Sequence, residues 1–206
     1  MTKKRITIAI PDAGPLISLA MGNALDLLLS ARPGVELVVT DIVHFETTAL
    51  SDRFADGAQI ADFLSKNKQR IAIKETTIGK LALPVLKKQL EKGENVQWGE
   101  DYGELSIISF IKGARTFNPG DSTMVLIEDD WFEENAYTLP GNIHLVSTGS
   151  FLNGLERRGI IQSAKEIKDR ILKKRPGFRV NHLVDREAEK SPEGTTWEES
   201  FRPRRG

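Results

Sequence analysis

Cysteine is absent from the 206-residue chain, and histidine and aromatic residues are scarce. Without cysteine the protein can form no disulfide bond, offer no thiolate to zinc and use no cysteine nucleophile. The three histidines, His44, His144 and His182, lack the spacing of a zinc site, so we assign them to packing or to the surface. These absences are typical of a protein that works in the reducing cytoplasm.

Long hydrophobic runs are also absent. No uninterrupted apolar stretch approaches the roughly 20 residues that a membrane-spanning helix needs, so we expect no membrane association. The first residues include Lys3, Lys4 and Arg5, but the apolar stretch that follows ends at Pro11 and Asp12. That stretch is too short for the core of a secretory signal, and we expect a first strand there instead.

Neither sign of charge is in excess, because 29 Lys and Arg residues balance 29 Asp and Glu residues. This balance argues against a surface that attracts nucleic acid everywhere, although a local basic patch could still bind it. Three common motifs are missing as well: the dinucleotide-binding Gly-x-Gly-x-x-Gly, the phosphate-binding Gly-Lys-Ser/Thr and the Gly-x-Ser-x-Gly of serine hydrolases. The absence of these motifs therefore disfavours dinucleotide-binding enzymes, enzymes with a phosphate-binding loop, and serine hydrolases.

A sizeable core can form, since 39% of the residues are hydrophobic and 28% are charged. Residues 5–11 and 35–41 are short, β-branched runs bounded by proline, glycine or aspartate, which predicts buried strands of a parallel sheet. Residues 15–31 between them carry apolar side chains at helical spacing, and Gly34 lies where the chain would pass from helix to strand. The first 41 residues therefore predict a βαβ unit.

The alternation continues along the chain. We predict further strands and helices from the same patterns; the strands are at 69–75, 122–129 and 142–148, and the helices at 42–50, 56–66, 78–91, 102–114 and 150–159. Strands that alternate with helices indicate an α/β fold, here a three-layer α/β/α sandwich with a central, mostly parallel sheet.

The chain divides into a predicted domain at residues 1–174 and a polar extension at residues 175–206. The extension loses apolar periodicity, so we expect it to be mobile or ordered by a partner. The helix-rich stretch from Asp56 to Gln89 could form a clip over a site or a dimer surface, and the sequence does not choose between them.

Four acids follow the predicted strands at the same edge of the sheet. Asp12 follows the first strand, Glu46 lies one helical turn beyond the second, Glu104 opens a helix after Gly103, and Asp129 closes the strand at 122–129. Ligands of open α/β sheets bind beyond the carboxyl ends of the strands, so these acids should meet in space. Carboxylates are the ligands that Mg²⁺ and Mn²⁺ prefer, and a cation offsets their mutual repulsion. A divalent metal site is predicted.

Each acid taken alone also has a structural explanation. Asp12 and Asp129 could cap the helices that follow them, Glu104 suits a first helical turn, and Glu46 could be a solvated surface residue. The joint arrangement is what favours the metal site. Sequence leaves the fourth ligand open among Glu128, Asp129 and Asp130, and the position at the strand end favours Asp129.

The segments that carry these acids resemble those of PIN-domain proteins, the family that includes the VapC-type ribonuclease toxins. The similar segments are IPDAGPLISLA, TDIVHFET, DYGELSIISFI and VLIEDDWFEENA, and the resemblance spans residues 6–162. It places the family's site acids on Asp12, Glu46, Glu104 and Asp129, with Ser106 near the site. The chain departs from many small PIN toxins in its longer middle region and its long extension.

The resemblance implies a metal-dependent endoribonuclease, in which Mg²⁺ or Mn²⁺ activates a water molecule for hydrolysis of RNA. Asp12, Glu104 and Asp129 would hold the metal, and Glu46 would bind a second ion or orient the attacking water. A small antitoxin and a homodimer are further expectations from the family. Lys112 and Arg115 are the nearest cations in sequence for the RNA phosphates, unless they merely end a solvated helix.

Two other functions remain open. A catalytically inactive PIN scaffold could bind RNA or protein without cleaving it. A phospho-acceptor receiver domain could gather Asp12, Asp41 and Asp129 around Mg²⁺, but it would need a lysine at the end of a late strand. The strand at 142–148 ends in Ser147 and Thr148 instead, which makes the receiver function the weaker of the two.

Overall fold

The computed structural model describes residues 5–30, 35–94, 96, 99, 101–113, 121–135, 139–175, 183 and 196–200. These residues contain one five-stranded sheet in which every pair of neighbouring strands is parallel. Its strands are β1 (Arg5–Pro11), β2 (Glu36–Thr40), β3 (Ile71–Lys74), β4 (Asp121–Ile127) and β5 (Ile143–Ser147), in the order β3-β2-β1-β4-β5. The sequence predicted all five, so the α/β class and its parallel sheet are confirmed.

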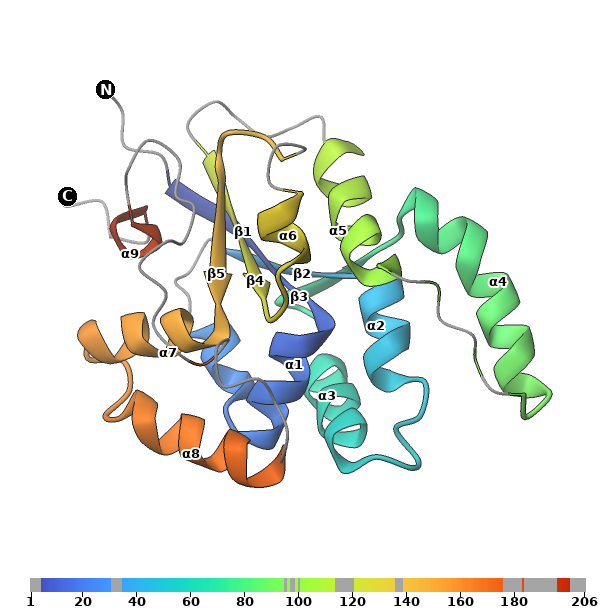
Figure 1. Ribbon diagram of the computed structural model, residues 1–206, viewed down its shortest axis with the longest axis horizontal. Helices are drawn as coiled ribbons and strands as arrows, with labels where there is room; N and C mark the ends of the chain where they lie inside the picture. Colours follow the sequence, from blue (N-terminus) through green and yellow to red (C-terminus); the bar gives the residue numbers. More distant parts are fainter. Residues whose placement is uncertain are drawn as a thin grey trace.

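Helices cover both faces of this sheet (Figure 1). The described helices are α1 (Ala13–Met21), α2 (Asp41–Thr48), α3 (Ala55–Lys66), α4 (Thr77–Glu91), α5 (Tyr102–Gly113), α6 (Trp131–Glu134), α7 (Thr148–Arg157), α8 (Ala164–Lys174) and α9 (Trp197–Ser200), with a 3-10 turn η1 (Leu25–Leu29). Helix α1 packs against α3, α7 and α8, while α5 packs against β2, α2 and α4. The arrangement is consistent with a three-layer α/β/α sandwich.

The core lies between these layers, and its centre is formed by β1 and β4. Every residue of β4 from Ser122 to Ile127 is buried, as is the whole of β5. Strands of a parallel sheet are covered on both faces, which explains why β4 and β5 are buried continuously, without alternation of buried and exposed residues. No helix in the described part of the chain is long and apolar enough to cross a membrane.

The predicted helix at 15–31 is divided in the structure. Helix α1 ends at Met21, Asn23 adopts a φ of 50°, and η1 follows. A left-handed residue interrupts an α-helix, and asparagine tolerates that conformation better than most residues. Apolar spacing alone did not reveal the interruption.

Helix α8 was not predicted. Most of its residues are charged, above all lysines, and its buried stripe consists only of Ala164, Ile167 and Ile171. These positions are three and four residues apart, so they lie on one helical face. Ser163 caps the helix by accepting a hydrogen bond from the Glu166 backbone N–H, at 3.2 Å.

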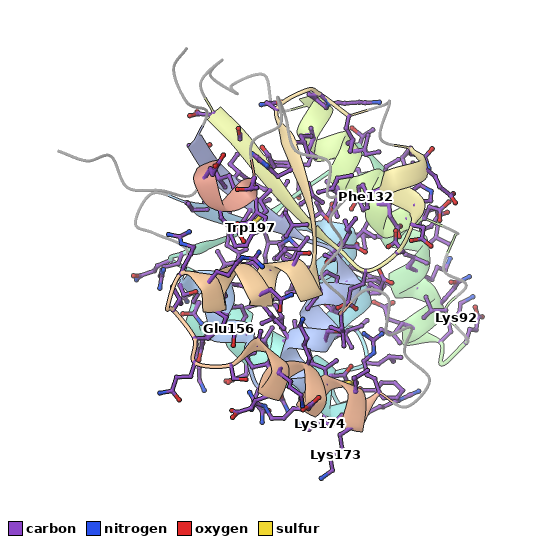
Figure 2. The ribbon with its side chains drawn as sticks, turned by 60° about the vertical axis from the view of Figure 1, so that its left-hand side comes forward. Lys92, Phe132, Glu156, Lys173, Lys174 and Trp197 are labelled. Atoms are coloured by element: carbon purple, nitrogen blue, oxygen red, sulfur yellow. The ribbon has the colours of Figure 1, made fainter. Side chains whose placement is uncertain are left out.

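Two described parts of the extension contact the domain. Leu183 and Trp197 are 3% and 4% exposed. The Trp197 ring lies 5.8 Å from that of Phe151 on α7, measured between ring centroids. Figure 2 shows Trp197 beside α7. The extension is thus attached at these points, and the mobility of residues 186–206 stays a prediction.

Candidate metal site

The neighbouring strands β1 and β4 bring two of the predicted acids to one edge of the sheet. They pair in parallel, with Pro11 opposite Leu126, and the Asp12 N–H donates to the Leu126 carbonyl at 3.0 Å. Asp12 is the N-cap residue of α1, but its side chain makes no capping hydrogen bond. Capping therefore does not account for this carboxylate.

Three carboxylates form a compact group at this edge. Asp12, Glu104 and Asp129 each offer one oxygen, and these oxygens lie within 4.8 Å of one another. Oxygens bound to one divalent ion at about 2.0–2.6 Å can be at most about 4–5 Å apart, so the group fits a single ion. The Asp129 carboxylate is further oriented by the Trp131 N–H, which donates to Oδ1 at 2.9 Å.

Asp12 supplies an oxygen that lacks a donor. Its side chain is buried, and Oδ1 has no hydrogen-bond partner. A buried carboxylate oxygen is costly unless a hydrogen bond, a proton or a cation compensates it. A metal ion, unlike a hydrogen bond or a proton on Asp12, would compensate the charges of Glu104 and Asp129 at the same time.

Gly103 opens the space beside these oxygens. A Cβ at this position would lie 3.2 Å from Asp12 Oδ1 and 3.3 Å from Glu46 Oε2. The missing side chain therefore lets α5 approach both acids closely. It also locates Glu46, which is outside the three-residue group but points at the same side of α5.

The electrostatics of the group favour a bound cation. Burial, and then the charges of Glu104, Asp129 and Glu46, raise the pKa of Asp12 well above its ordinary value. Burial also raises the pKa of Glu104 to about 7, against a backbone hydrogen bond that lowers it, and the charges of Asp129 and Glu46 add to the rise. Although much of Glu46 is exposed, burial of its carboxylate raises its pKa too. Without a cation, the cluster retains protons near neutral pH.

The structure separates the three consecutive acids after β4. Asp129 belongs to the cluster, whereas Asp130 is exposed and outside it. Glu128 is buried and faces α1, where its Oε2 accepts hydrogen bonds from Ser18 Oγ at 2.9 Å and from Arg175 Nη1 at 3.0 Å. The preference for Asp129 as the fourth site acid agrees with this geometry.

Asp41 has a structural task. It accepts hydrogen bonds from the Thr76 N–H at 3.0 Å, the Thr76 hydroxyl at 2.8 Å and the Ile42 N–H at 3.0 Å. These bonds fasten the start of α4 to the start of α2. A receiver domain would need Asp41 beside Asp12 and Asp129. The group that could hold a metal contains Glu104 and not Asp41.

Ser106 lies behind the site and joins two elements. Its hydroxyl donates to the Gly103 carbonyl at 2.6 Å, so its single proton is used, and Thr40 Oγ1, 2.6 Å away, must donate to it. Thr40 ends β2 and caps α2. Sequence analysis missed Thr40, which differs from an ordinary helix cap only through this contact with a residue 66 positions away.

Of the two predicted phosphate-binding cations, only Lys112 is among the described residues, and it lies away from the site. Lys112 is exposed in the last turn of α5, eight residues and therefore about 12 Å along the axis from Glu104, and Arg115 lies outside the described residues. A cavity of about 460 Å³ between α2 and α4 is lined by His44, Lys80 and Lys87, among other residues. Burial and the charge of Lys87 lower the pKa of His44.

The fold and the site together define a class: an α/β protein with a parallel sheet and a carboxylate cluster at its carboxyl edge that could hold a metal ion. Comparisons of the chain with protein-family models, with curated proteins and with solved structures find no match. The resemblance to PIN-domain proteins therefore rests on the sequence motifs alone.

Proposed function

We propose that the protein is a divalent-metal-dependent endoribonuclease that hydrolyses RNA phosphodiester bonds with Mg²⁺ or Mn²⁺. The observation that carries the proposal is the grouping of Asp12, Glu104 and Asp129 around a buried Asp12 oxygen that has no hydrogen-bond partner. The group lies at the carboxyl edge of a parallel sheet, where ligands of α/β proteins bind. The sequence resemblance supplies RNA as the substrate.

The residues of the chain divide the work. A bound Mg²⁺ or Mn²⁺ would polarise the phosphate and lower the pKa of a water molecule. Asp12, Glu104 and Asp129 would hold the ion, and the raised pKa values of Asp12 and Glu104 mean that ion binding would displace protons from these two residues. Glu46 lies beside Asp12 across from Gly103, and its raised pKa suits a base that orients and deprotonates the attacking water.

Cations for the RNA backbone come from α4 in this proposal. Lys80 and Lys87 line the cavity between α2 and α4, on the face of α2 that carries His44. Glu46 lies on the opposite face of α2, so an RNA strand at the acidic cluster would extend around α2 to reach them. They replace Lys112, which lies at the wrong end of α5. The two lysines account for local attraction of RNA by a chain whose net charge is +0.

The biological setting implied by the resemblance is a toxin that a small antitoxin neutralises by covering the acidic edge. Co-expression with the neighbouring reading frame tests this part separately, because an antitoxin would relieve any growth defect that the protein causes. A homodimer is part of the same expectation and is tested by the molecular mass in solution.

Cleavage of a mixture of structured and single-stranded RNAs by purified protein tests the activity, with Mg²⁺, with Mn²⁺ and with EDTA. The wild-type chain should cleave with either ion, and both EDTA and the Asp12→Asn substitution should abolish cleavage. RNA binding without metal-dependent cleavage would instead favour an inactive scaffold. Equal cleavage by the Asp12→Asn protein would exclude this site as the source of the activity.

A further inference from the structure

Glu128 is a buried acid that the proposed metal site does not use. It lies directly between β4, which ends at Ile127, and the metal-site residue Asp129. Its side chain is only 3% exposed, contacts Ser18 on α1 and is not part of the metal-site group. If the partners of the Glu128 side chain are fixed, the backbone of Glu128 is fixed as well. The next residue, Asp129, is a proposed metal ligand.

The main partner of Glu128 comes from far along the chain. Arg175 is the first residue after α8, and its Nη1 donates to Glu128 Oε2 at 3.0 Å and to Ser18 Oγ at 2.7 Å. Ser18 itself donates to the same Glu128 oxygen at 2.9 Å. The three side chains thus form a closed set of contacts that joins α1, the end of β4 and the end of α8.

Charge makes this set rigid. A carboxylate at such burial is strongly destabilising when it has no partner, so the guanidinium and the carboxylate hold each other in place. Side-chain exposure of Arg175 is 24%, which leaves the pair partly shielded from water. The two lysines that close α8, Lys173 and Lys174, are exposed instead (Figure 2).

Glu128 also lies against the turn that carries Asp12. A Cβ at Gly14 would lie 2.9 Å from Glu128 Cβ and 3.1 Å from its Oε2. Gly14 is two residues after Asp12, in the first turn of α1. Glu128 is therefore packed against the segment of one metal-site acid and is covalently next to another.

We propose that Arg175 is a positioning residue for the metal site and acts through Glu128. By holding the Glu128 carboxylate against Ser18, it fixes the end of β4 and with it the distance between the Asp129 and Asp12 carboxylates. The inference rests on the proposed metal site. It also gives the first residue of the C-terminal extension an indirect part in metal binding.

The test is a Mn²⁺ titration of the full chain by calorimetry, with Arg175→Ala and Arg175→Lys compared with wild type. Loss of a side chain that hydrogen-bonds a metal ligand typically weakens metal affinity about 10- to 100-fold. Arg175 bonds the neighbour of a ligand, so we expect a loss at the lower end of this range for Arg175→Ala. Arg175→Lys should recover part of the affinity, because its ammonium group keeps a positive charge beside Glu128. Arg170→Ala is the matched control, since Arg170 also belongs to α8 but donates to the Gly22 carbonyl, at 2.9 Å.

Hydrogen exchange gives a readout that needs no metal. The Trp131 N–H donates to Asp129 Oδ1, so its exchange should accelerate in metal-free Arg175→Ala, while the amide of Val125 within β4 stays protected. Ser18→Ala removes the Ser18 hydroxyl but keeps the contact between Arg175 and Glu128, so it should accelerate exchange of the Trp131 N–H less. This variant replaces Arg175→Ala in the test if Arg175→Ala does not fold.

The outcomes separate the two proposals. Absence of Mn²⁺ binding by the wild-type chain would overturn the metal site and this inference with it. Normal wild-type binding, together with unchanged Mn²⁺ affinity and unchanged Trp131 exchange in the folded Arg175 variants, would overturn the positioning role alone. An equal loss of affinity in Arg170→Ala would also overturn it, because the effect would then be a general one of α8.

Discussion

Gly103 is the residue whose missing side chain shapes the site most directly. It lies in the first turn of α5, where glycine is less favourable than alanine by about 1 kcal/mol if only helix formation matters. Its role here is spatial, because Asp12 Oδ1 and Glu46 Oε2 both lie within 3.3 Å of the point that a Cβ would occupy.

The Gly103→Ala variant should lose metal affinity without unfolding. The added methyl group presses on the two carboxylates, whereas the helix itself gains from alanine. Mn²⁺ titration and urea unfolding measure the two effects. Gly113→Ala is the control at the other end of α5, where a Cβ would meet nothing within 4 Å. Equal Mn²⁺ affinity in Gly103→Ala and wild type would contradict the proposed geometry.

The pKa of Glu104 makes a prediction for the metal-free protein. Burial raises this pKa from 4.5 to about 7, so between those values the folded chain retains a proton that the unfolded chain releases. The free energy that Glu104 contributes to folding is therefore present below about pH 4.5 and is lost as the pH rises toward 7. Urea unfolding in EDTA should show a larger loss between about pH 5 and pH 8 for wild type than for Glu104→Gln.

Metal should reverse this trend. Excess Mg²⁺ or Mn²⁺ binds the deprotonated cluster of the folded state, so the wild-type chain should gain stability as the pH rises, and Glu104→Gln should gain much less. A pH dependence that is the same in the two proteins, with and without metal, would show that Glu104 has an ordinary pKa.

At the scale of elements, the position of α5 depends on the hydrogen bonds of Thr40 and Ser106. Thr40 at the end of β2 donates to Ser106, which donates to the Gly103 carbonyl. Both hydroxyls are fully buried. The first turn of α5, with Glu104 on it, is thereby fixed to the sheet.

Removing either hydroxyl should cost stability. Ser106→Ala leaves the buried Thr40 hydroxyl without its acceptor, for which we expect a loss of about 1–3 kcal/mol in the free energy of unfolding. Thr40→Val should have a similar effect, and the double variant should lose less than the sum of the two, because the partners share one bond. Strictly additive losses in urea unfolding would mean that the two hydroxyls do not interact.

The elements also show what the sequence could predict. The five strands are short runs rich in apolar and β-branched residues, so their pattern predicts them. The rule that parallel strands end at one edge predicts that Asp12 and Asp129 meet there, and the resemblance adds Glu104 at the start of a helix. The choice between Glu128 and Asp129 depends on Arg175, which is 47 residues away from Glu128. Helix α8 was not predicted from the sequence because only a three-residue stripe of it is buried. Contacts between distant residues are not encoded in local periodicity.

At the scale of the whole molecule, α9 attaches part of the extension to α7. Trp197 packs on Phe151 and fills the space beside Gly154, where a Cβ would lie 2.1 Å from the Trp197 ring. An ion pair between Arg157 and Glu198 lies next to it. Apolar burial and charge could each hold this segment.

Burial of Trp197 should be the dominant contribution. Trp197→Ala should lower the free energy of unfolding by about 3 kcal/mol, as is usual for a buried aromatic residue. Arg157→Ala should cost less than about 1 kcal/mol, since its side chain is half exposed and water screens the pair. Thermal or urea unfolding measures both. A Trp197→Ala protein as stable as wild type would mean that the extension does not dock in solution.

The whole proposal depends on one property, the binding of a divalent ion by the acidic cluster. Calorimetric titration of Mn²⁺ into the wild-type chain, Glu104→Gln and the exposed control Glu91→Gln measures it without knowledge of the RNA target. Wild type and Glu91→Gln should bind with the same affinity and release protons on binding, whereas Glu104→Gln should bind much more weakly. Equal affinities in all three proteins, or no binding by wild type, would contradict the metal site and the nuclease function that rests on it.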